Sequence, residues 1–198
     1  ATTGPLVHCA PSVAAYDAGA RQLVQEGDGV LEIGCQLGRT TTIVADERAA
    51  SFVVGVDMDR ELNGKSGRNT GSYRTHATPA EAGLPAEAVE LHLLDPWDTL
   101  AVLRAVDGRA IDVLLIDVNS LVGNDLALTA LALARQLARV LPTLRTILLK
   151  SRTLAKLERQ LVLPTEYAAE AADDGVPSGW IPRIIPAVGV NEYRAAAL

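Results

Sequence analysis

The sequence has few cysteines and no long apolar segment. Cys9 and Cys35 are its two cysteines, and neither lies in a CxxC pair or near a cluster of histidines. Two isolated cysteines cannot form a disulfide framework and show no metal-ligand spacing. No apolar run approaches the roughly 20 residues that would cross a bilayer. We therefore expect no metal, no membrane partner, and a reducing intracellular compartment, cytoplasmic or organellar.

The start of the chain lacks both a methionine and a recognisable targeting signal. It reads Ala1-Thr2-Thr3, with no basic segment followed by an apolar one. A secretory signal peptide would show both features. The missing methionine leaves open that a leader has been removed.

Basic residues are also scarce. The 198 residues carry 24 acidic and 18 basic side chains, for a net charge of −6. This balance does not suit a general nucleic-acid binder. Only three of the basic residues are lysines: Lys65, Lys150 and Lys156. With 48% hydrophobic and 21% charged residues, the composition is that of one ordinary globular domain, which we expect to span residues 1–198.

Short apolar runs alternate with segments of helical period, a pattern typical of parallel sheets. Helices are expected from Gly38 to Ala45, over residues 98–106, and over residues 126–141 with a cap at Asn124 or Asp125. The stretch 60–88, rich in glycine and proline, gives no clear element. Five strands are expected at 30–33, 52–57, 89–94, 111–116 and 146–150, and two edge strands near 179–185 and 187–194.

Charged residues follow four of the five main strands. They are Asp57, Asp95, Asp117 and Lys150, whereas the first strand ends in the loop Gly34–Gly38. In open α/β sheets, ligands bind beyond the carboxyl ends of the strands. A glycine-containing loop there lets the backbone approach a ligand closely. A carboxylate at the position of Asp57 can bind both hydroxyls of a ribose.

The glycine spacing and Glu32 distinguish between two nucleotide-type cofactors. A dinucleotide site would show G-x-G-x-x-G, and this loop has G-x-x-x-G. Glu32, two residues before the first glycine, would repel a pyrophosphate and favour a cationic ligand. An NAD enzyme is therefore a distant alternative.

These motifs resemble those of class I S-adenosylmethionine-dependent methyltransferases over residues 28–150. Residues 30–38 (VLEIGCQLG) are similar to the first motif of that family, and residues 54–59 (VGVDMD) to the second. Leu94-Asp95 resembles the third motif, and residues 111–117 (IDVLLID) resemble the fourth. The resemblance implies a Rossmann-like α/β fold with helices on both faces of a mostly parallel seven-stranded sheet. Its strand order would be 3-2-1-4-5-7-6, with a cofactor half at about 28–100 and an acceptor half at about 101–198.

The resemblance also implies roles for individual residues. Glu32 and the loop with Gly34, Gln36 and Gly38 would hold the methionine part of S-adenosyl-L-methionine, although Gln36 stands where the family usually has glycine. Asp57 would bind the ribose. The adenine would meet Met58, Asp95 and Trp97. Simpler interpretations stay open: a tight turn for the glycines, a helix cap for Asp95 or Asp98, and a core position for Trp97.

Asp117 and Lys150 are the expected catalytic pair. Both lie at the ligand edge, where together they could orient or deprotonate a hydroxyl. Ribose 2′-O-methyltransferases of the fibrillarin and heat-shock rRNA types use such an aspartate and such a lysine. Their further lysine has no counterpart, because Asp17 occupies its place. The sequence lacks both the N/D-P-P-Y/F motif of amino-group methylation and a suitably placed nucleophilic cysteine.

Two basic segments suggest a phosphate-bearing acceptor. Residues 60–76 and 145–159 each carry several basic side chains and follow strands. RNA is therefore the preferred partner, and the expected role is in RNA modification. The RNA phosphates would be bound by Arg145, Arg152, Lys156 and Arg159. A small-molecule O-methyltransferase stays open, as does a degenerate methyltransferase-like subunit that binds a protein partner without catalysis. The sequence does not determine the oligomeric state.

Overall fold

The structure, a computed structural model, describes residues 4–36, 38–58, 79–82, 88–118, 126–161, 183–185 and 190–194. At 81–82, 158–161, 183–185 and 190–194 it describes the backbone alone. Within these ranges, no helix has the length and apolar character needed to span a membrane. Both Cys9 and Cys35 are buried free thiols.

The described strands form one sheet of eight, in the order β4-β3-β2-β5-β6-β1-β8-β7. The first six in this order run parallel; β8 is antiparallel to β1, and β7 is antiparallel to β8. The Rossmann-like arrangement and the order of the five main strands are confirmed. The bounds are β1 (Leu6–Ala10), β2 (Gly29–Ile33), β3 (Phe52–Asp57), β4 (Val89–Leu93), β5 (Val113–Ile116), β6 (Thr146–Lys150), β7 (Arg183–Ile185) and β8 (Val190–Arg194).

The expected number of seven strands is wrong because β1 is an additional member of the sheet. β1 lies between β6 and β8, where the expected order placed no strand. It pairs in parallel with β6, from Leu6 opposite Thr146 to Ala10 opposite Lys150. Its other edge pairs with β8, antiparallel. The segment is five residues long and contains a histidine, so nothing in its pattern distinguished it from a loop.

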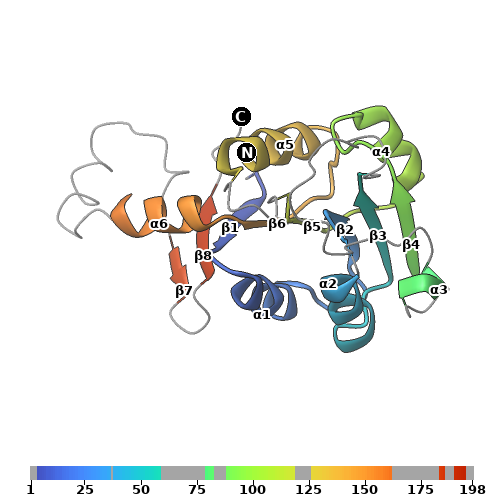
Figure 1. Cartoon of the computed structure of the whole chain (residues 1–198), viewed down its shortest axis with the longest axis horizontal. Helices are drawn as coiled ribbons and strands as arrows, with labels where there is room; N and C mark the ends of the chain where they lie inside the picture. The colour runs from blue at the N-terminus through green and yellow to red at the C-terminus, as the bar shows by residue number, and fades with distance from the viewer. Residues whose placement is uncertain are drawn as a thin grey trace, which may run out of the picture.

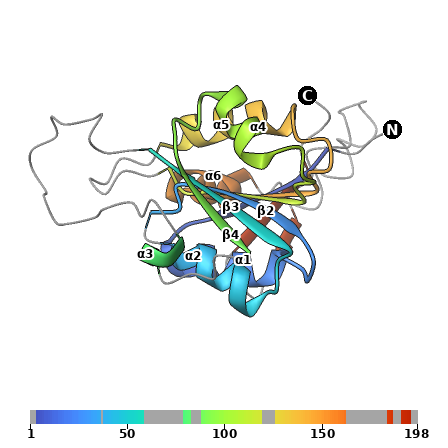
Figure 2. The ribbon, with the colours of Figure 1, turned by 90° about the vertical axis from the view of Figure 1, so that its right-hand side faces the viewer.

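Helices cover both faces of this sheet (Figures 1 and 2). The helices α1 (Val13–Leu23) and α2 (Arg39–Thr42) lie on one face, and α4 (Thr99–Val106) and α5 (Ala127–Ala138) lie on the other. The helix expected from Gly38 to Ala45 is present as α2 and continues as the π-helical turn η1 (Ile43–Glu47). α3 (Pro79–Ala82) and α6 (Arg152–Leu161) complete the described helices. The caps expected at Asn124 and Asp125 lie outside the described residues.

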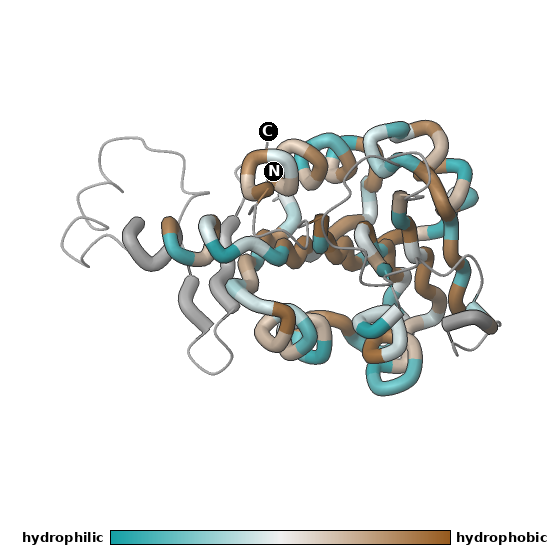
Figure 3. Tube along the Cα trace, in the orientation of Figure 1, coloured by the Kyte–Doolittle hydropathy of each residue, from teal (hydrophilic) through white to brown (hydrophobic). Residues whose placement is uncertain are grey.

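Side-chain alternation along the strands divides the core between the two faces. Figure 3 shows hydrophobic residues concentrated along the central strands. Strands buried on both faces are expected to be almost continuously apolar, and β5 is buried along its whole length. Leu31, Ile33 and Leu114 pack toward α4 and α5. Val30 and Leu115 pack instead with Tyr16 of α1.

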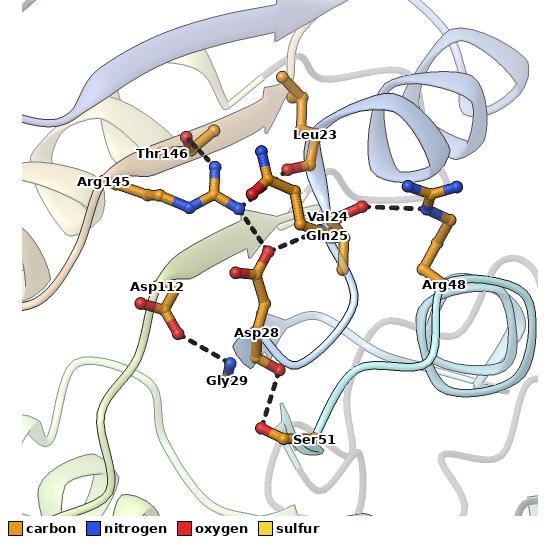
Figure 4. Close-up of polar contacts among 10 residues, drawn as sticks. All are labelled: Leu23, Val24, Gln25, Asp28, Gly29, Arg48, Ser51, Asp112, Arg145 and Thr146. Atoms are coloured by element: carbon orange, nitrogen blue, oxygen red, sulfur yellow. Dashed lines mark hydrogen bonds and ion pairs between the residues drawn. The ribbon is translucent and has the colours of Figure 1, made fainter.

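Arg145 does not belong to the ligand edge, which corrects its expected role in RNA binding. It precedes β6, at the edge where the parallel strands begin. There its guanidinium forms an ion pair with Asp28 and donates to the carbonyl of Leu23 (Figure 4). Asp112 accepts from the N–H of Gly29 in the same group, at 2.9 Å. These contacts hold the starts of the strands together, on the side away from Lys150.

Candidate functional site

The chain changes direction across the sheet between β2 and β5. From β2 it adds β3 and β4 on one side, and β5 and β6 extend the other side. Such a switch point, at the carboxyl ends of the strands, is where open α/β sheets bind ligands. A cleft lies there, and its walls come from the ends of β2, β3 and β5 and the loop after β4. It is lined by Ile33, Gly34, Gln36, Asp57, Met58, Pro96, Asp117 and Val118.

Gly34 allows two strand ends to meet closely at the base of the cleft. Its φ is +85°, in the left-handed region that favours glycine. A Cβ atom at this position would lie only 2.0 Å from the carbonyl oxygen of Asp117. The Gly34 N–H also donates to the carbonyl of Val56 at 2.7 Å. Gly34 was expected to let the backbone approach a ligand. In the structure, its lack of a side chain also lets the loop after β2 pack closely on the end of β5.

Asp57 organises the same loop from the end of β3. One oxygen of its carboxylate accepts from the N–H of Gln36 at 2.7 Å, and the other accepts from the N–H of Met58 at 2.7 Å. The half-buried carboxylate lines the cleft. Gln36 adopts a φ of +46°, a conformation that favours glycine. Gln36 therefore keeps the backbone shape that a glycine would give, with an added side chain at the cleft wall.

Glu32 lies beneath the cleft rather than in its lining. Its side chain is 2% exposed, and it accepts a hydrogen bond from the Thr41 hydroxyl of α2. Burial raises the pKa of Glu32 to about 7 against the lowering effect of that bond, and the charges of Asp117 and Asp57 raise it further. The carboxyl therefore titrates near neutral pH. A cation in the cleft would favour its ionised form.

Asp117 and Lys150 lie side by side, as expected for neighbouring strand ends. Ile116 pairs with Leu149 in register, so the next residue of each strand also meets its neighbour. The Lys150 ammonium donates to both oxygens of Asp117, at 2.9 and 2.7 Å. The two side chains are 18% and 22% exposed. This ion pair borders the cleft through Asp117 and offers a donor and an acceptor to a hydroxyl.

Of the three residues expected to contact the adenine, only one lies in the cleft. Met58 lines the cleft, but Asp95 and Trp97 are exposed and do not. The Asp95 carboxylate accepts from the N–H of Trp97 at 2.9 Å. Asp98, the alternative cap, accepts from the N–H of Ala101 and begins α4. Pro96, the residue before Trp97, lines the cleft instead.

Gly38 and Asp17 both help to place α2. Gly38, with φ +74°, precedes the first residue of that helix. Asp17 is 2% exposed, where it accepts from the Thr40 hydroxyl at 3.1 Å and lies 2.7 Å from the Arg39 guanidinium. It therefore fastens α1 to α2. Thr40 and Thr41 were missed in the sequence, although adjacent threonines after a glycine loop are a pattern that can bond buried acids.

The basic segment after β6 is only partly placed. Arg152 and Lys156 are exposed on α6, which starts directly after Ser151. The side chain of Arg159 and residues 60–76 lie outside the described part of the chain. Two exposed cations therefore lie at the edge where the strands end.

Comparison of the sequence with family models and with curated proteins finds no significant match. Solved structures do match. The rRNA methyltransferase aviRa from Streptomyces viridochromogenes has 15% identity and a TM-score of 0.51, over 91% of this chain and 83% of that chain. A protein of the NADB-Rossmann superfamily from Streptococcus agalactiae has 14% identity and a TM-score of 0.50, over 96% and 72%.

A third match is shorter. TrmK from M. capricolum, in complex with S-adenosyl-homocysteine, has 13% identity and a TM-score of 0.33, over 50% of this chain and 38% of that chain. This chain thus spans well under half the length of that protein. The strand order, the switch-point cleft and the two longer matches lead to one conclusion about architecture. The chain has a Rossmann-like fold, which it shares with the rRNA methyltransferase aviRa and with the NADB-Rossmann protein.

Proposed function

We propose that the chain binds S-adenosylmethionine in this cleft and transfers its methyl group to a hydroxyl. The observation that carries the proposal is the set of acids on one face of the switch point. Asp57 and Asp117 line the cleft, and Glu32 lies below it. A sulfonium and an ammonium are both cations, so a set of negatively charged, hydrogen-bond-accepting carboxylates fits the ligand. A pyrophosphate would instead meet carboxylates, which disfavours NAD.

Each residue then has a defined task. Asp57 binds the ribose hydroxyls, while the loop around Gly34 and Gln36 encloses the methionine part. Met58 packs on the adenine. When bound, the cofactor supplies an electrophilic methyl group. The chain's own contribution is mainly to hold a hydroxyl in line with that group, which accounts for much of the acceleration in such reactions.

Asp57→Ala is expected to weaken binding of S-adenosylhomocysteine at least tenfold. The variant removes charge-assisted hydrogen bonds to the ribose, each contributing about 1.5–3 kcal/mol. Isothermal titration calorimetry with S-adenosylmethionine, S-adenosylhomocysteine and NAD measures the effect. Asp112→Ala is the matched control, because it also removes a carboxylate that accepts from a backbone N–H, but at the opposite edge. Equal affinity in wild type and Asp57→Ala would remove Asp57 from the site.

The acceptor proposed is RNA, through a ribose hydroxyl. Asp117 can accept the hydroxyl proton while Lys150 donates to its oxygen. Arg152 and Lys156 extend positive charge from this pair along α6. The rRNA methyltransferase with the same fold supports this choice of acceptor. A small-molecule acceptor needs no such exposed cations.

Lys150→Met and Lys156→Met are expected to affect different steps, turnover in the first variant and RNA binding in the second. Lys150→Met should leave cofactor affinity within twofold and lower turnover about a hundredfold, a typical effect of a lost proton-transfer or positioning group. Lys156→Met should keep turnover at saturating RNA. It should also flatten the salt dependence of RNA binding, by about 0.7 in log–log slope for one phosphate of a single strand.

Filter binding of cellular RNA from about 50 to 300 mM salt and tritium transfer from labelled cofactor provide the measurements. Failure of RNA to bind at low salt, with labelling of a small-metabolite pool, would indicate a small-molecule O-methyltransferase. Cofactor binding without labelling of either pool would indicate a non-catalytic subunit that binds a protein partner.

A further inference from the structure

Tyr16 has a buried hydroxyl without a hydrogen-bond partner among the described residues. The side chain is 1% exposed, and its hydroxyl oxygen makes no hydrogen bond within the described structure. A buried hydroxyl in this state has lost its bonds to water without replacement. The ring nitrogens of His8 are in the same condition. The Tyr16 hydroxyl and the His8 ring are therefore buried polar groups in the described structure that a bound ligand could supply with a hydrogen bond.

Tyr16 lies on the face of the sheet that carries the proposed site. It projects from α1 and packs in one cluster with Leu115 of β5 and Leu148 of β6. Because side chains alternate along a strand, the residues two positions after these, Asp117 and Lys150, belong to the same face. Glu32 pairs in register with Leu115 and shares that face. The tyrosine therefore lies under the part of the site next to β5.

The groups around Tyr16 are acidic. Burial, followed by the negative charges of Glu32, Asp117 and Asp17, raises the pKa of the Tyr16 hydroxyl well above its usual range. The hydroxyl is thus a neutral group with one donor and two acceptor positions. Two of these acids already have partners in α2, because Asp17 bonds Thr40 and Glu32 bonds Thr41. Within the described part of the chain, the Tyr16 hydroxyl has none.

The direction of the cofactor across the sheet identifies the missing partner. In the proposed function, Asp57 holds the ribose and the loop around Gly34 and Gln36 holds the methionine part. The amino-acid end then lies over the end of β2, the strand next to β5. Tyr16 lies under this part of the site, on the same face of the sheet as Glu32 and Asp117. An ammonium is the cation that such acids favour. The hydroxyl oxygen can accept from it while the hydroxyl proton is donated to a carboxylate.

We propose that the Tyr16 hydroxyl contacts the amino-acid end of the bound cofactor and accepts a hydrogen bond from its ammonium. This inference rests on the proposed function. It makes Tyr16 a specificity residue that distinguishes a complete cofactor from one without the amino-acid part. Neither motif of the β2 or β3 loops contains it.

Tyr16→Phe tests this proposal, because its expected effects on stability and on binding have opposite signs. Removing a buried hydroxyl that has no partner in the described part of the chain should raise the urea midpoint of the ligand-free protein. The same change should weaken S-adenosylhomocysteine binding about tenfold. It should leave binding of 5′-methylthioadenosine, which lacks the amino-acid part, within twofold. His8→Leu is the matched control: it removes another unpartnered buried polar group on this face, and should raise the midpoint without changing either affinity.

The outcomes separate this inference from the proposed function. Wild type that binds neither ligand would overturn both. Wild type that binds S-adenosylhomocysteine, together with a Tyr16→Phe variant of equal affinity, would overturn the tyrosine contact alone. Equal weakening of both ligands by Tyr16→Phe would also overturn it, since the effect would then not concern the amino-acid end. Weakening of S-adenosylhomocysteine alone would support it.

Discussion

Gly34→Ala is expected to lower the free energy of unfolding by about 4 kcal/mol, near the upper end of single substitutions. The added Cβ would lie 2.0 Å from the carbonyl oxygen of Asp117. Neither backbone can move away easily. Gly34 donates to Val56 at 2.7 Å, and Asp117 donates to Ile33 at 2.9 Å. The clash therefore strains the junction of β2, β3 and β5.

Gly27→Ala separates this clash from the cost of backbone conformation. Gly27 has a φ of +84°, nearly the same as the +85° of Gly34, but its added Cβ would have no atom within 4 Å. Gly27→Ala should therefore cost about 1–2 kcal/mol, the penalty of a left-handed conformation alone. Urea denaturation of both variants and wild type measures the difference. Equal losses in the two variants would show that the contact with Asp117 relaxes without cost.

Gly34→Ala should also affect ligand binding. Displacement of Asp117 would move the carboxylate that holds the Lys150 ammonium at 2.7 Å. Displacement of the loop would move the N–H of Gln36 away from Asp57. Cofactor affinity should therefore fall in any fraction that still folds, whereas Gly27→Ala should bind like wild type.

Glu32→Gln is expected to change how stability depends on pH, by about 3 kcal/mol between pH 4 and pH 8. The Glu32 carboxyl has a pKa of about 7 when folded, against an ordinary value of 4.5. Below pH 4.5 it is protonated in both states and carries no penalty. As the pH rises toward 7, the unfolded chain releases the proton first, so wild-type stability falls. Glutamine does not titrate and can still accept from Thr41.

The measurement is the difference in unfolding free energy between Glu32→Gln and wild type, from urea denaturation across about pH 4 to 8. The difference should rise with pH and level off above about 7. Burial lowers the pKa of His8 to about 4, which weakens the fold in acid, but this effect is common to both proteins and cancels. Glu47→Gln is the control. Its hydrogen bond from Arg21 lowers the pKa of Glu47, so its difference should change in the opposite direction. Parallel curves for Glu32→Gln and wild type would contradict the prediction.

The sequence by itself determined the central part of the architecture. Strands buried on both faces must be almost continuously apolar, so β2, β3, β5 and β6 were visible as short apolar runs. Parallel strands end at one edge, which is enough to place Asp57, Asp117 and Lys150 together. The pairing of Asp117 with Lys150 follows from the register of two neighbouring strands. These features depend on local patterns, which are present in the linear sequence.

Charge patterns along the chain were less informative, because neighbours in sequence can lie at opposite edges of a sheet. Arg145 and Lys150 belong to one basic segment, but β6 separates them by about 16 Å at roughly 3.3 Å per residue. Arg145 consequently pairs with Asp28 at the far edge. β1 was missed for a related reason. Its place between β6 and β8 depends on pairing with strands more than a hundred residues away.

Only the tertiary structure decided which buried polar groups have partners. Glu32 was expected to hold the methionine part of the cofactor; the structure shows that it lies beneath the cleft and accepts a hydrogen bond from Thr41 of α2. Asp17 links α1 to α2 through its ion pair with Arg39, and Trp97 is exposed. Tyr16 looked like any aromatic residue on an amphipathic helix. That its hydroxyl has no hydrogen-bond partner among the described residues is visible only with α1 packed on the sheet. Hydrogen bonds between distant segments depend on distance and direction in three dimensions. Residue types and their spacing along the chain give neither the distance nor the direction.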